Sequence, residues 1–350
     1  LSPAHGGRPT GCHHQGCQRR RWLIVADSFS LLQSEWWARV KGQQGWNRVV
    51  RDGPSRVILE RRVGPLRLWY APHAAFPTGS PELATAIARN LGSAPRKPHL
   101  LRWDIPYQDS SQLRRELVAA GLSPAPVRVQ PPDTVVVDLT PDESSILGAM
   151  KSKTRYNARL AAKRGVEFHR HYHQSALGQL KDWYNLYRET AARDRIAIHS
   201  YNYYRSVVSI AVEMRDAGEA APEIVLHTAT HERELLAGLV VVHWEGMATY
   251  LYGASSNHKR NLMASYGLQW EAMRTAKHAG LTGYDMFGIP PSDDPHHPMH
   301  GLYRFKTGFG GHQVHRPGCW DFPVRQGAVA VYHALERLRS WYYLNFRKRR

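Results

Sequence analysis

The 350-residue sequence has few cysteines and no long apolar run. Three cysteines argue against a disulfide scaffold and favour a reducing compartment. The longest candidate for a membrane span, 235–242, is far shorter than the roughly 20 apolar residues that a spanning helix needs. Residues 1–21 lack the apolar core of a secretion signal and are expected to form a disordered leader. These absences predict a cytoplasmic protein.

Metal-ligand patterns are also weak. Cys12 and Cys17 with His13 and His14 could hold zinc, but their spacing does not fit a standard finger and no second cysteine pair follows. The segment "SDDPHHPMHG" resembles a set of metal ligands, but a substrate-side loop is the preferred interpretation. The expectation is that the protein uses no metal and no cofactor.

Acidic residues are outnumbered, with 29 Asp and Glu against 47 Lys and Arg and a net charge of +18. Such a field attracts polyanions, which include nucleic acid, phosphorylated ligands and anionic membrane surfaces. A basic soluble protein from an arginine-rich proteome is the alternative. Because 42% of the residues are hydrophobic and 11 are tryptophan, the chain can bury substantial cores and is not a disordered polycation.

The order strand, strand, helix, strand occurs twice. The first copy comprises 55–63, 64–72, the helix 81–92 and the strand 99–106. The second comprises 234–244 and 247–255, preceded by a further strand at 222–231, then the helix 262–280 and the strand 283–290. Both copies close on Ile-Pro, at Ile105-Pro106 and Ile289-Pro290. The pattern predicts an internal structural duplication.

Between the copies, one helix is predicted from Thr140 to Arg164. Thr140 would be its N-cap, with Pro141 at N1 and Glu143 completing a capping box, and Gly165 would end it. Its second half has no acid and carries cations four residues apart. A solvated face would normally mix charges. The pattern therefore favours phosphate contact at Lys151, Arg155, Arg159 and Lys163.

A doubled core of this order suggests GCN5-related acyltransferase (GNAT-like) domains. Such cores hold coenzyme A through a Gly-rich turn at a helix N-terminus. Here Asn261, Met263 and Ser265 stand where glycines would be needed, and "PTGSPELATA" in the first half has no such loop either. We therefore expect no coenzyme A, and an acyl donor that is large and anionic.

Five segments resemble the FemABX family of peptidoglycan-bridge aminoacyltransferases. They are "LLQSEWWARVKGQQGW", "MKSKTRYNARLAAKRGVEF", "YLYGASSNHKRNLMASYGLQWEAM", "YDMFGIP" and "GLYRFKTGFGG", in the family's order from about Gln33 to Asp321. The resemblance implies transfer of an amino acid from aminoacyl-tRNA to an amine of a peptidoglycan precursor, either lipid II or UDP-MurNAc-peptide. It thereby makes tRNA the expected partner of the basic stripe. It implies a mixed α+β fold with tandem GNAT-like domains, the first formed by 22–140 plus 317–350 and the second by 141–316.

The resemblance also implies site residues. Phe305 and Lys306 match the family's Phe-Lys pair, and Lys306 would contact the tRNA acceptor end or the developing oxyanion. A snorkelling surface lysine is the alternative. Tyr252 matches a tyrosine near the reacting groups, although it could merely pack. Asp104 matches a carboxylate proposed as the base, although it could cap a strand end.

Phosphates of the acceptor are expected at basic residues of the first domain and of the "RDRIAIHSYNYY" loop. Histidine stands at 199 where a family member has arginine, four residues before Tyr203, which would make phosphate binding pH-dependent or shift it to neighbouring arginines. The candidate acceptor residues are Arg39, Lys41, Arg193, Arg195, His199 and Tyr203.

The C-terminal segment 334–350 is predicted to be a helix that ends in four cations. It could dock on the body or lie on the anionic inner face of the membrane, with Trp341 and Phe346 inserted. Two further functions stay open: another tRNA-dependent transferase that acts on a protein N-terminus or a lipid amine, and a non-catalytic RNA- or membrane-binding module.

Overall fold

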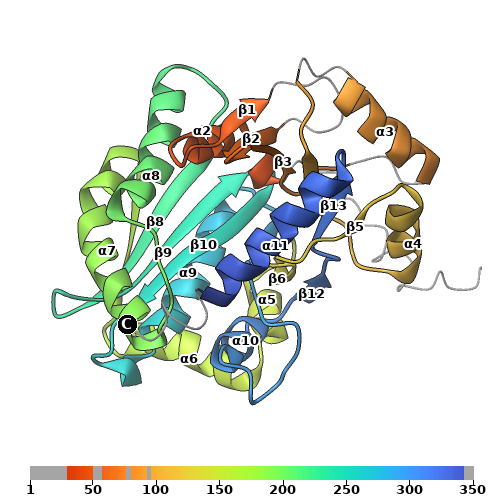
Figure 1. Cartoon of the computed structure of the whole chain (residues 1–350). Coiled ribbons are helices and arrows are strands. Elements are labelled where there is room, and N and C mark those ends of the chain that lie inside the picture. Colours follow the sequence, from red (N-terminus) through yellow and green to blue (C-terminus); the bar gives the residue numbers. More distant parts are fainter. Residues whose placement is uncertain (1–29, 50–56, 76–79, 93–95, 343–350) are drawn as a thin grey trace, which may run out of the picture.

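Two mixed sheets organise the chain (Figure 1). The structure, a computed structural model, describes residues 30–49, 57–75, 80–92 and 96–342. The first sheet has the order β1 (Asn47–Val49), β2 (Ile58–Val63), β3 (Leu66–Ala71), β4 (Leu100–Asp104), β13 (Cys319–Pro323) and β5 (Ser123–Pro124). The second has the order β12 (His312–His315), β6 (Asp133–Asp138), β11 (Gly283–Asp285), β10 (Met247–Ser255), β9 (Glu234–Trp244), β8 (Glu223–His231) and β7 (Glu167–Tyr172).

The predicted duplication is confirmed. In the first sheet β2 and β3 are antiparallel, and α3 (Ser80–Gly92) leads from β3 to the parallel strand β4. In the second sheet β9 and β10 are antiparallel, and α9 (Ala264–His278) leads from β10 to the parallel strand β11. The fold is thus a tandem pair of GNAT-like α/β units. The strand predicted at 283–290 is shorter than expected, since β11 ends at Asp285.

Each face of the second sheet has its own apolar core. One core lies under α5 (Glu143–Ala149), α6 (Ser152–Lys163) and α9. The other lies under α7 (His173–Asp194) and α8 (Tyr201–Asp216), and α2 (Glu35–Gly42) joins it with Trp36, whose indole N–H donates to Val207 O at 3.0 Å. A helix near the start of the chain therefore packs into the second half of the molecule.

A β-bulge in β10 directs Tyr250 into one of these cores and Tyr252 toward the other. Tyr250 pairs with Val241, and after the bulge Tyr252 pairs with Val240, so the two tyrosines face opposite sides of the sheet although they are two residues apart. A Cβ at Gly253 would lie 1.8 Å from the Tyr250 hydroxyl oxygen. Glycine at this position lets the Tyr250 ring lie along the strand.

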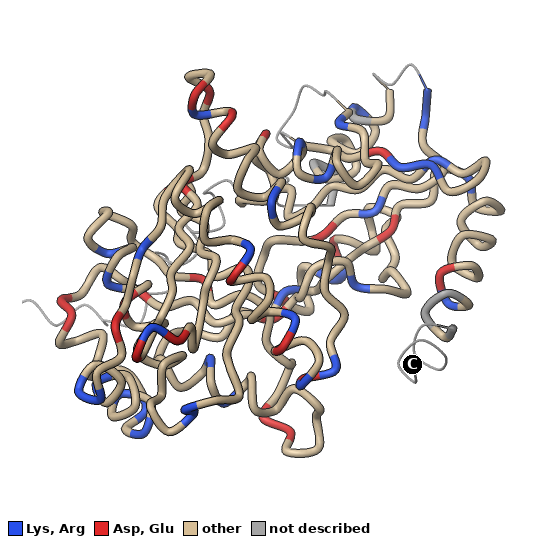
Figure 2. The backbone as a smooth tube through the Cα atoms, turned by 90° about the vertical axis from the view of Figure 1, so that its left-hand side faces the viewer, with Lys and Arg blue, Asp and Glu red and all other residues tan. Residues whose placement is uncertain are grey.

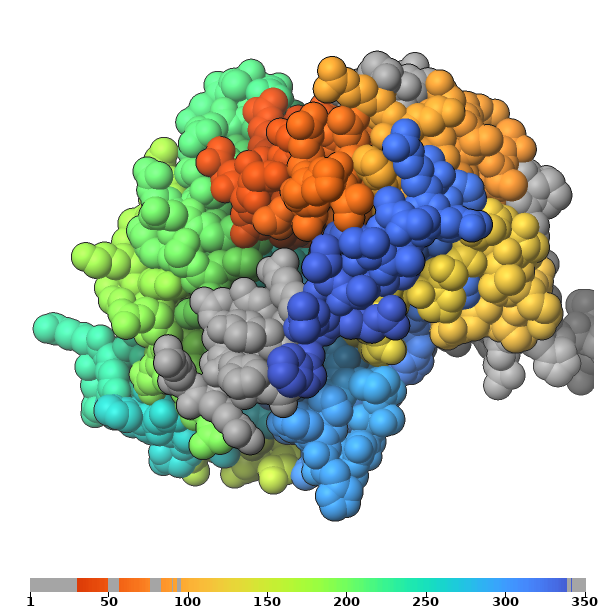
Figure 3. Space-filling model, viewed as in Figure 1, coloured from red at the N-terminus to blue at the C-terminus, as the bar shows by residue number. Residues whose placement is uncertain are grey.

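The C-terminal segment returns to the first sheet, as expected. β13 inserts between β4 and β5, and α11 (Gln326–Tyr342) crosses the front of the molecule beside it (Figure 3). Arg102 of β4 is buried and donates to both oxygens of Asp321 at 2.8 Å and to Glu336 at 2.7 and 2.8 Å. This ion-pair network fixes α11 to the sheet.

The helix predicted from Thr140 to Arg164 is wrong in one respect, because it is two helices. α5 is capped by Asp142 rather than Thr140 and ends at Ala149, and α6 starts at Ser152. The break follows from packing: Met150 is buried, and the Lys151 N–H donates to Gly308 O at 2.9 Å. The predicted end is confirmed, with Arg164 as C-cap and Gly165 at φ 77°.

No helix among the described residues is long and apolar enough to cross a membrane. The leader 1–21, its Cys12, Cys17, His13 and His14, and the last eight residues, 343–350, lie outside the described part of the chain. The division into domains at residue 140 stays a prediction; β6, which precedes that position, pairs within the second sheet.

Candidate functional site

Four of the residues predicted from the sequence meet where α2, the start of α8 and β10 converge. The Tyr203 and Tyr252 hydroxyl oxygens lie 3.0 Å apart in a hydrogen bond. The His199 ring lies against the Tyr203 ring, with 4.0 Å between centroids. Lys41 Nζ lies 5.8 Å from the Tyr203 centroid and 4.7 Å from that of Trp37. We call Lys41, His199, Tyr203 and Tyr252 the tyrosine site.

A glutamine links the two basic groups of the tyrosine site. Lys41 Nζ donates to Gln44 Oε1 at 3.0 Å, and Gln44 Nε2 lies 3.4 Å from His199 Nδ1. Burial lowers the pKa of Lys41 to about 8, and the Arg61 charge adds to this. Burial also lowers the pKa of His199, with the Lys41 charge as second cause. Near neutral pH the site therefore holds one cation, on Lys41, and a neutral imidazole.

Further aromatic rings surround the two tyrosines. Tyr204 meets Tyr252 edge-on at 5.0 Å between centroids, and the Tyr187 centroid lies 5.6 Å from that of Tyr204 and 6.5 Å from that of Tyr252. Burial raises the pKa of Tyr203 and of Tyr252. Both phenols are therefore neutral hydrogen-bonding groups rather than bases at physiological pH.

The arginines among the candidate acceptor residues make other contacts than Lys41 does. Arg39 is exposed and binds Glu219 through both oxygens at 3.0 and 2.6 Å. Arg193 binds Asp194 and the Ser255 carbonyl, and Arg195 is the exposed left-handed C-cap of α7. Arg39 and Arg193 are thus engaged in ion pairs or hydrogen bonds elsewhere, whereas the Lys41 ammonium lies over the Tyr203 ring within the tyrosine site.

Lys306, on α10 (His300–Thr307), is not a snorkelling surface residue. It is buried, and its Nζ donates to the carbonyl oxygens of Met286, Phe287 and Gly288 at 2.7, 2.5 and 3.0 Å. An ammonium has three N–H groups, so these carbonyls use all of them. Burial lowers the pKa of Lys306 to about 7, against the opposing effect of Asp285.

This lysine lies just past the carboxyl end of β11, where its parallel pairing with β10 stops and β10 continues to Ser255. The strands pair at three positions, the last joining Thr249 to Asp285, before the bulge changes the course of β10. In open α/β sheets, ligands bind beyond such strand ends. Lys306 Nζ lies 5.0 Å from the Tyr250 centroid, and Phe287 has a positive φ of 52°, a strained conformation for a bulky residue.

Phe305 and Asp104 occupy more structural positions. Phe305 packs edge-on against Tyr266 and Phe309 at 4.9 and 5.2 Å between centroids. Asp104 is buried in the first sheet, where it accepts from the Tyr70 hydroxyl at 2.6 Å and the Cys319 thiol at 3.2 Å. Burial raises the pKa of Asp104. The described hydrogen bonds of Asp104 join it to neither Lys306 nor the tyrosine site, and its role as base stays a prediction.

The basic stripe lies on α6, with Lys151 as its N-cap. Lys151, Arg159 and Lys163 are exposed, and Arg155 is half-buried and donates to Gly148 O at 3.0 Å. Within the part of the chain that the structure describes, none of the four forms an ion pair. Its contact with tRNA stays a prediction.

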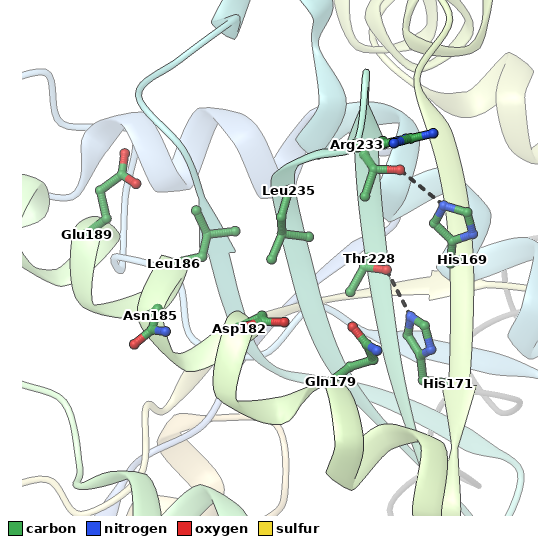
Figure 4. A pocket seen from close by; sticks show the side chains of 11 residues that line it. His169, His171, Gln179, Asp182, Asn185, Leu186, Glu189, Thr228, Arg233 and Leu235 are labelled. Atoms are coloured by element: carbon green, nitrogen blue, oxygen red, sulfur yellow. Dashed lines mark hydrogen bonds between the residues drawn. The ribbon is translucent and has the colours of Figure 1, made fainter.

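A polar groove of about 700 Å³ lies between α7 and the strands β7 and β8 (Figure 4). Gln179, Asp182 and Glu189 of α7 form one wall. On the other wall, His169 and His171 of β7 bond the hydroxyls of Thr230 and Thr228 at 3.1 and 3.0 Å. Neither the tyrosine site nor Lys306 lines this groove. Over the described residues, no group of three or more His, Cys, Asp or Glu is placed to hold a metal ion.

Sequence reasoning missed Gln44 and the carbonyls that hold Lys306. Gln44 follows α2 in a polar turn, where glutamine has no distinctive spacing. The three carbonyls belong to Met286, Phe287 and Gly288, inside a segment that was predicted to be a strand. The glycine at 288, inside that segment, was the available sequence signal for a turn at this point.

Comparisons with known proteins identify relatives. The model described as the FemAB family matches residues 122–210 and 219–337. Lipid II:glycine glycyltransferase of Staphylococcus epidermidis is 22% identical over 265 residues, covering 60% of this chain and 62% of that protein. The protein of the same name from Staphylococcus aureus is 21% identical over 270 residues, with the same coverage. The chain thus spans about three fifths of the length of these curated relatives.

Solved structures share the fold. A structure titled as FemX has a TM-score of 0.73 at 19% identity and covers 92% of this chain and 99% of its own. The C-terminal domain of an Agrobacterium fabrum protein described as a lysylphosphatidylglycerol synthetase has a TM-score of 0.56 at 15% identity, covering 91% and 95%. At these identities the likeness concerns the fold alone.

Proposed function

Since the chain belongs to the FemAB family, we propose that it is an aminoacyltransferase that extends the peptide of a peptidoglycan precursor. The donor is aminoacyl-tRNA, and the acceptor is an amine of lipid II or UDP-MurNAc-peptide. The name of the relatives, lipid II:glycine glycyltransferase, supports the lipid-linked form. The observation that carries the proposal is the convergence of Lys41, His199, Tyr203 and Tyr252 from three distant segments.

The tyrosine site suits the acceptor. Lys41 provides a positive charge for a phosphate, and the Tyr203 and Tyr252 hydroxyls donate or accept hydrogen bonds from the peptide. His199 stacks on Tyr203 and adds a second cation only below its lowered pKa. A neutral phenol pair beside a single cation orients the acceptor without binding it by charge alone.

The reaction forms a C–N amide bond and breaks the C–O ester bond to the tRNA ribose. The amine loses a proton, the carbonyl oxygen becomes an oxyanion, and the ribose hydroxyl leaves with a proton. Lys306 lies just past the end of β11, with its N–H groups on three carbonyls. We assign it to stabilise the oxyanion through its charge, since a direct hydrogen bond would first require the release of one carbonyl.

Place follows from the substrates. The donor is a cytoplasmic molecule, and a lipid-linked acceptor presents its peptide at the inner face of the membrane. A cytoplasmic protein with reversible contact at that face fits both. Val331, Leu335, Leu338 and Trp341 of α11 are 48–61% exposed, which gives this helix an apolar outer face.

The decisive experiment supplies a mixture of charged tRNAs with lipid II, UDP-MurNAc-pentapeptide or phosphatidylglycerol, read by mass spectrometry. A mass increase of one aminoacyl residue on either muropeptide supports the proposal and identifies the amino acid. Transfer to phosphatidylglycerol alone would replace it with the lipid-modifying alternative, for which the shared fold of the lysylphosphatidylglycerol synthetase domain is the reason to test. No transfer to any acceptor would favour a non-catalytic binding module.

A further inference from the structure

Helix α6 presents one flank whose cations have no acidic partner among the residues that the structure describes. Its twelve residues contain no acid, and with its flanking residues it carries Lys151, Lys153, Arg155, Arg159, Lys163 and Arg164. Elsewhere, cations are commonly paired: Arg39 with Glu219, Arg114 with Asp109, Lys259 with Glu232. A solvated helix is stabilised by opposite charges at i,i+4, so a run of cations without acids favours binding of a polyanion.

An exposed aromatic ring stands among these cations. Tyr156 is 61% exposed, one residue after Arg155 and three before Arg159. Nucleic acids offer both phosphates and flat bases, and a stacked base covers such a ring. A membrane would require an apolar outer face, but the small residues Ala158 and Ala161 are buried. The surface therefore fits RNA better than lipid.

The flank is held rigidly. Thr154, Asn157, Ala158 and Ala161 form the buried side, and a Cβ at Gly267 of α9 would lie 2.6 Å from the Ala161 Cβ, which shows how closely the two helices pack. At its end, Arg164 donates to the Asn261 carbonyl. A fixed row of cations loses little conformational entropy when it binds phosphates.

Its position connects it with the proposed chemistry. The Lys151 N–H donates to Gly308 O, two residues after Lys306. Twelve residues of helix extend about 18 Å from that point, or about five nucleotide steps at roughly 3.4 Å each. Figure 1 places α6 at the bottom of the molecule, and at that height Figure 2 shows several basic positions. A donor with its aminoacyl end at Lys306 can run along α6.

We propose that α6 is the docking track for the donor RNA next to its aminoacylated end, with Lys151, Arg155, Arg159 and Lys163 on phosphates and Tyr156 stacked on an unpaired base. The inference rests on the proposed function for the identity of the RNA. It assigns Tyr156 a role that the basic pattern alone did not indicate.

Binding of uncharged tRNA against salt concentration tests the track without chemistry. The variant replaces Lys151, Arg159 and Lys163 with Gln and keeps Arg155, whose bond to Gly148 supports the helix. Three lost phosphate contacts should reduce the log–log salt slope by about 2 to 3. The matched control replaces Arg115, Lys181 and Arg205, exposed on α4 (Ser111–Ala119), α7 and α8, with the same loss of charge. Equal slopes for the variant and the control would overturn the track.

Tyr156→Ala separates stacking from charge. It should weaken binding to tRNA at least about fivefold with an unchanged salt slope, whereas Tyr156→Phe should bind as the wild type does. Binding of a blunt RNA duplex should not respond to either substitution. Unchanged tRNA binding by Tyr156→Ala would refute the stacking role. If the triple variant loses sedimentation with anionic liposomes more strongly than it loses tRNA binding, the surface binds lipid instead.

Transfer assays keep the two proposals apart. With a charged full-length tRNA the triple variant should show a raised KM and an unchanged kcat. With a short aminoacylated trinucleotide, which reaches only the start of α6, the rise in KM should be smaller. Transfer that is unaffected by the triple variant with either donor refutes the track and leaves the proposed function standing. Specific loss of tRNA binding in a protein that transfers nothing supports the track and refutes the function.

Discussion

Replacement of Lys306 by Met tests whether its charge acts in the chemistry or only holds the chain after β11. The substitution removes three charge-assisted hydrogen bonds to Met286, Phe287 and Gly288, each about 1.5–3 kcal/mol. It also removes the cost of burying the ammonium, since a fall in pKa from 10.5 to about 7 corresponds to about 5 kcal/mol. The difference is a loss of roughly 0–4 kcal/mol, which a protein of ordinary stability survives.

Urea unfolding measures that loss, and single-turnover transfer measures the chemistry. If the Lys306 charge stabilises the oxyanion, the folded variant should lose at least about a hundredfold in rate. The matched control is Lys277→Met, because Lys277 Nζ donates to the Leu139 carbonyl at 2.8 Å but lies on α9, away from the proposed chemistry. The control should lose some stability and keep its rate. A folded Lys306→Met protein with a near wild-type single turnover refutes the catalytic assignment.

The pH dependence of stability has a definite sign. The pKa of Lys306 is about 7 in the folded protein and near 10.5 when unfolded, so the unfolded chain binds the additional proton between these values. Stability therefore rises with pH across that window. The free-energy difference between wild type and Lys306→Met should grow from pH 7 to pH 10. A constant difference would mean that the three carbonyls keep the ammonium charged.

Three further outcomes are expected. The KM for the acceptor should rise as the pH increases through the lowered pKa of His199, and rise again near pH 8, where Lys41 loses its charge. His199→Ala should remove the first rise and Lys41→Gln the second. A KM that does not change with pH would exclude both residues as phosphate ligands. The protein should sediment with anionic but not neutral liposomes and lose this on deletion of residues 341–350, unless α11 only docks on the first sheet. Acetyl-coenzyme A should not acylate either muropeptide, because both halves lack the Gly-rich turn, and transfer at a rate comparable with aminoacyl transfer would contradict this.

Elements with a strong local signal were predictable from the sequence. The repeated strand, strand, helix, strand order, the buried strands and the end of α6 at Gly165 each depend on periodicity or on one residue's backbone preference. The break between α5 and α6 was not predictable, because it depends on contacts with Gly308 and Gly310, far along the chain. A Cβ at Gly310 would lie 2.6 Å from Ala149 O, so this distant glycine permits the close approach that ends α5.

The candidate site was predictable by residue but not by geometry. The resemblance indicated Lys41, His199, Tyr203 and Tyr252 separately, and the fold brings them together through α2, which packs against α8. No pattern in the sequence indicates that Tyr250 and Tyr252 lie on opposite faces, since strand alternation places residues i and i+2 together and only the bulge reverses this.

The return of β13 to the first sheet determines the order in which the protein can fold during synthesis. β5 pairs with β13, and Arg102 finds its carboxylates at Asp321 and Glu336, more than 200 residues later. Until the ribosome has made those residues, β4 keeps an open edge and Arg102 lacks its partners. The strands of the second sheet are complete by His315, so this half closes first and the first half, although synthesised earlier, matures last. The N-terminal half of the nascent chain therefore carries an unpaired edge of β4 until β13 has been made.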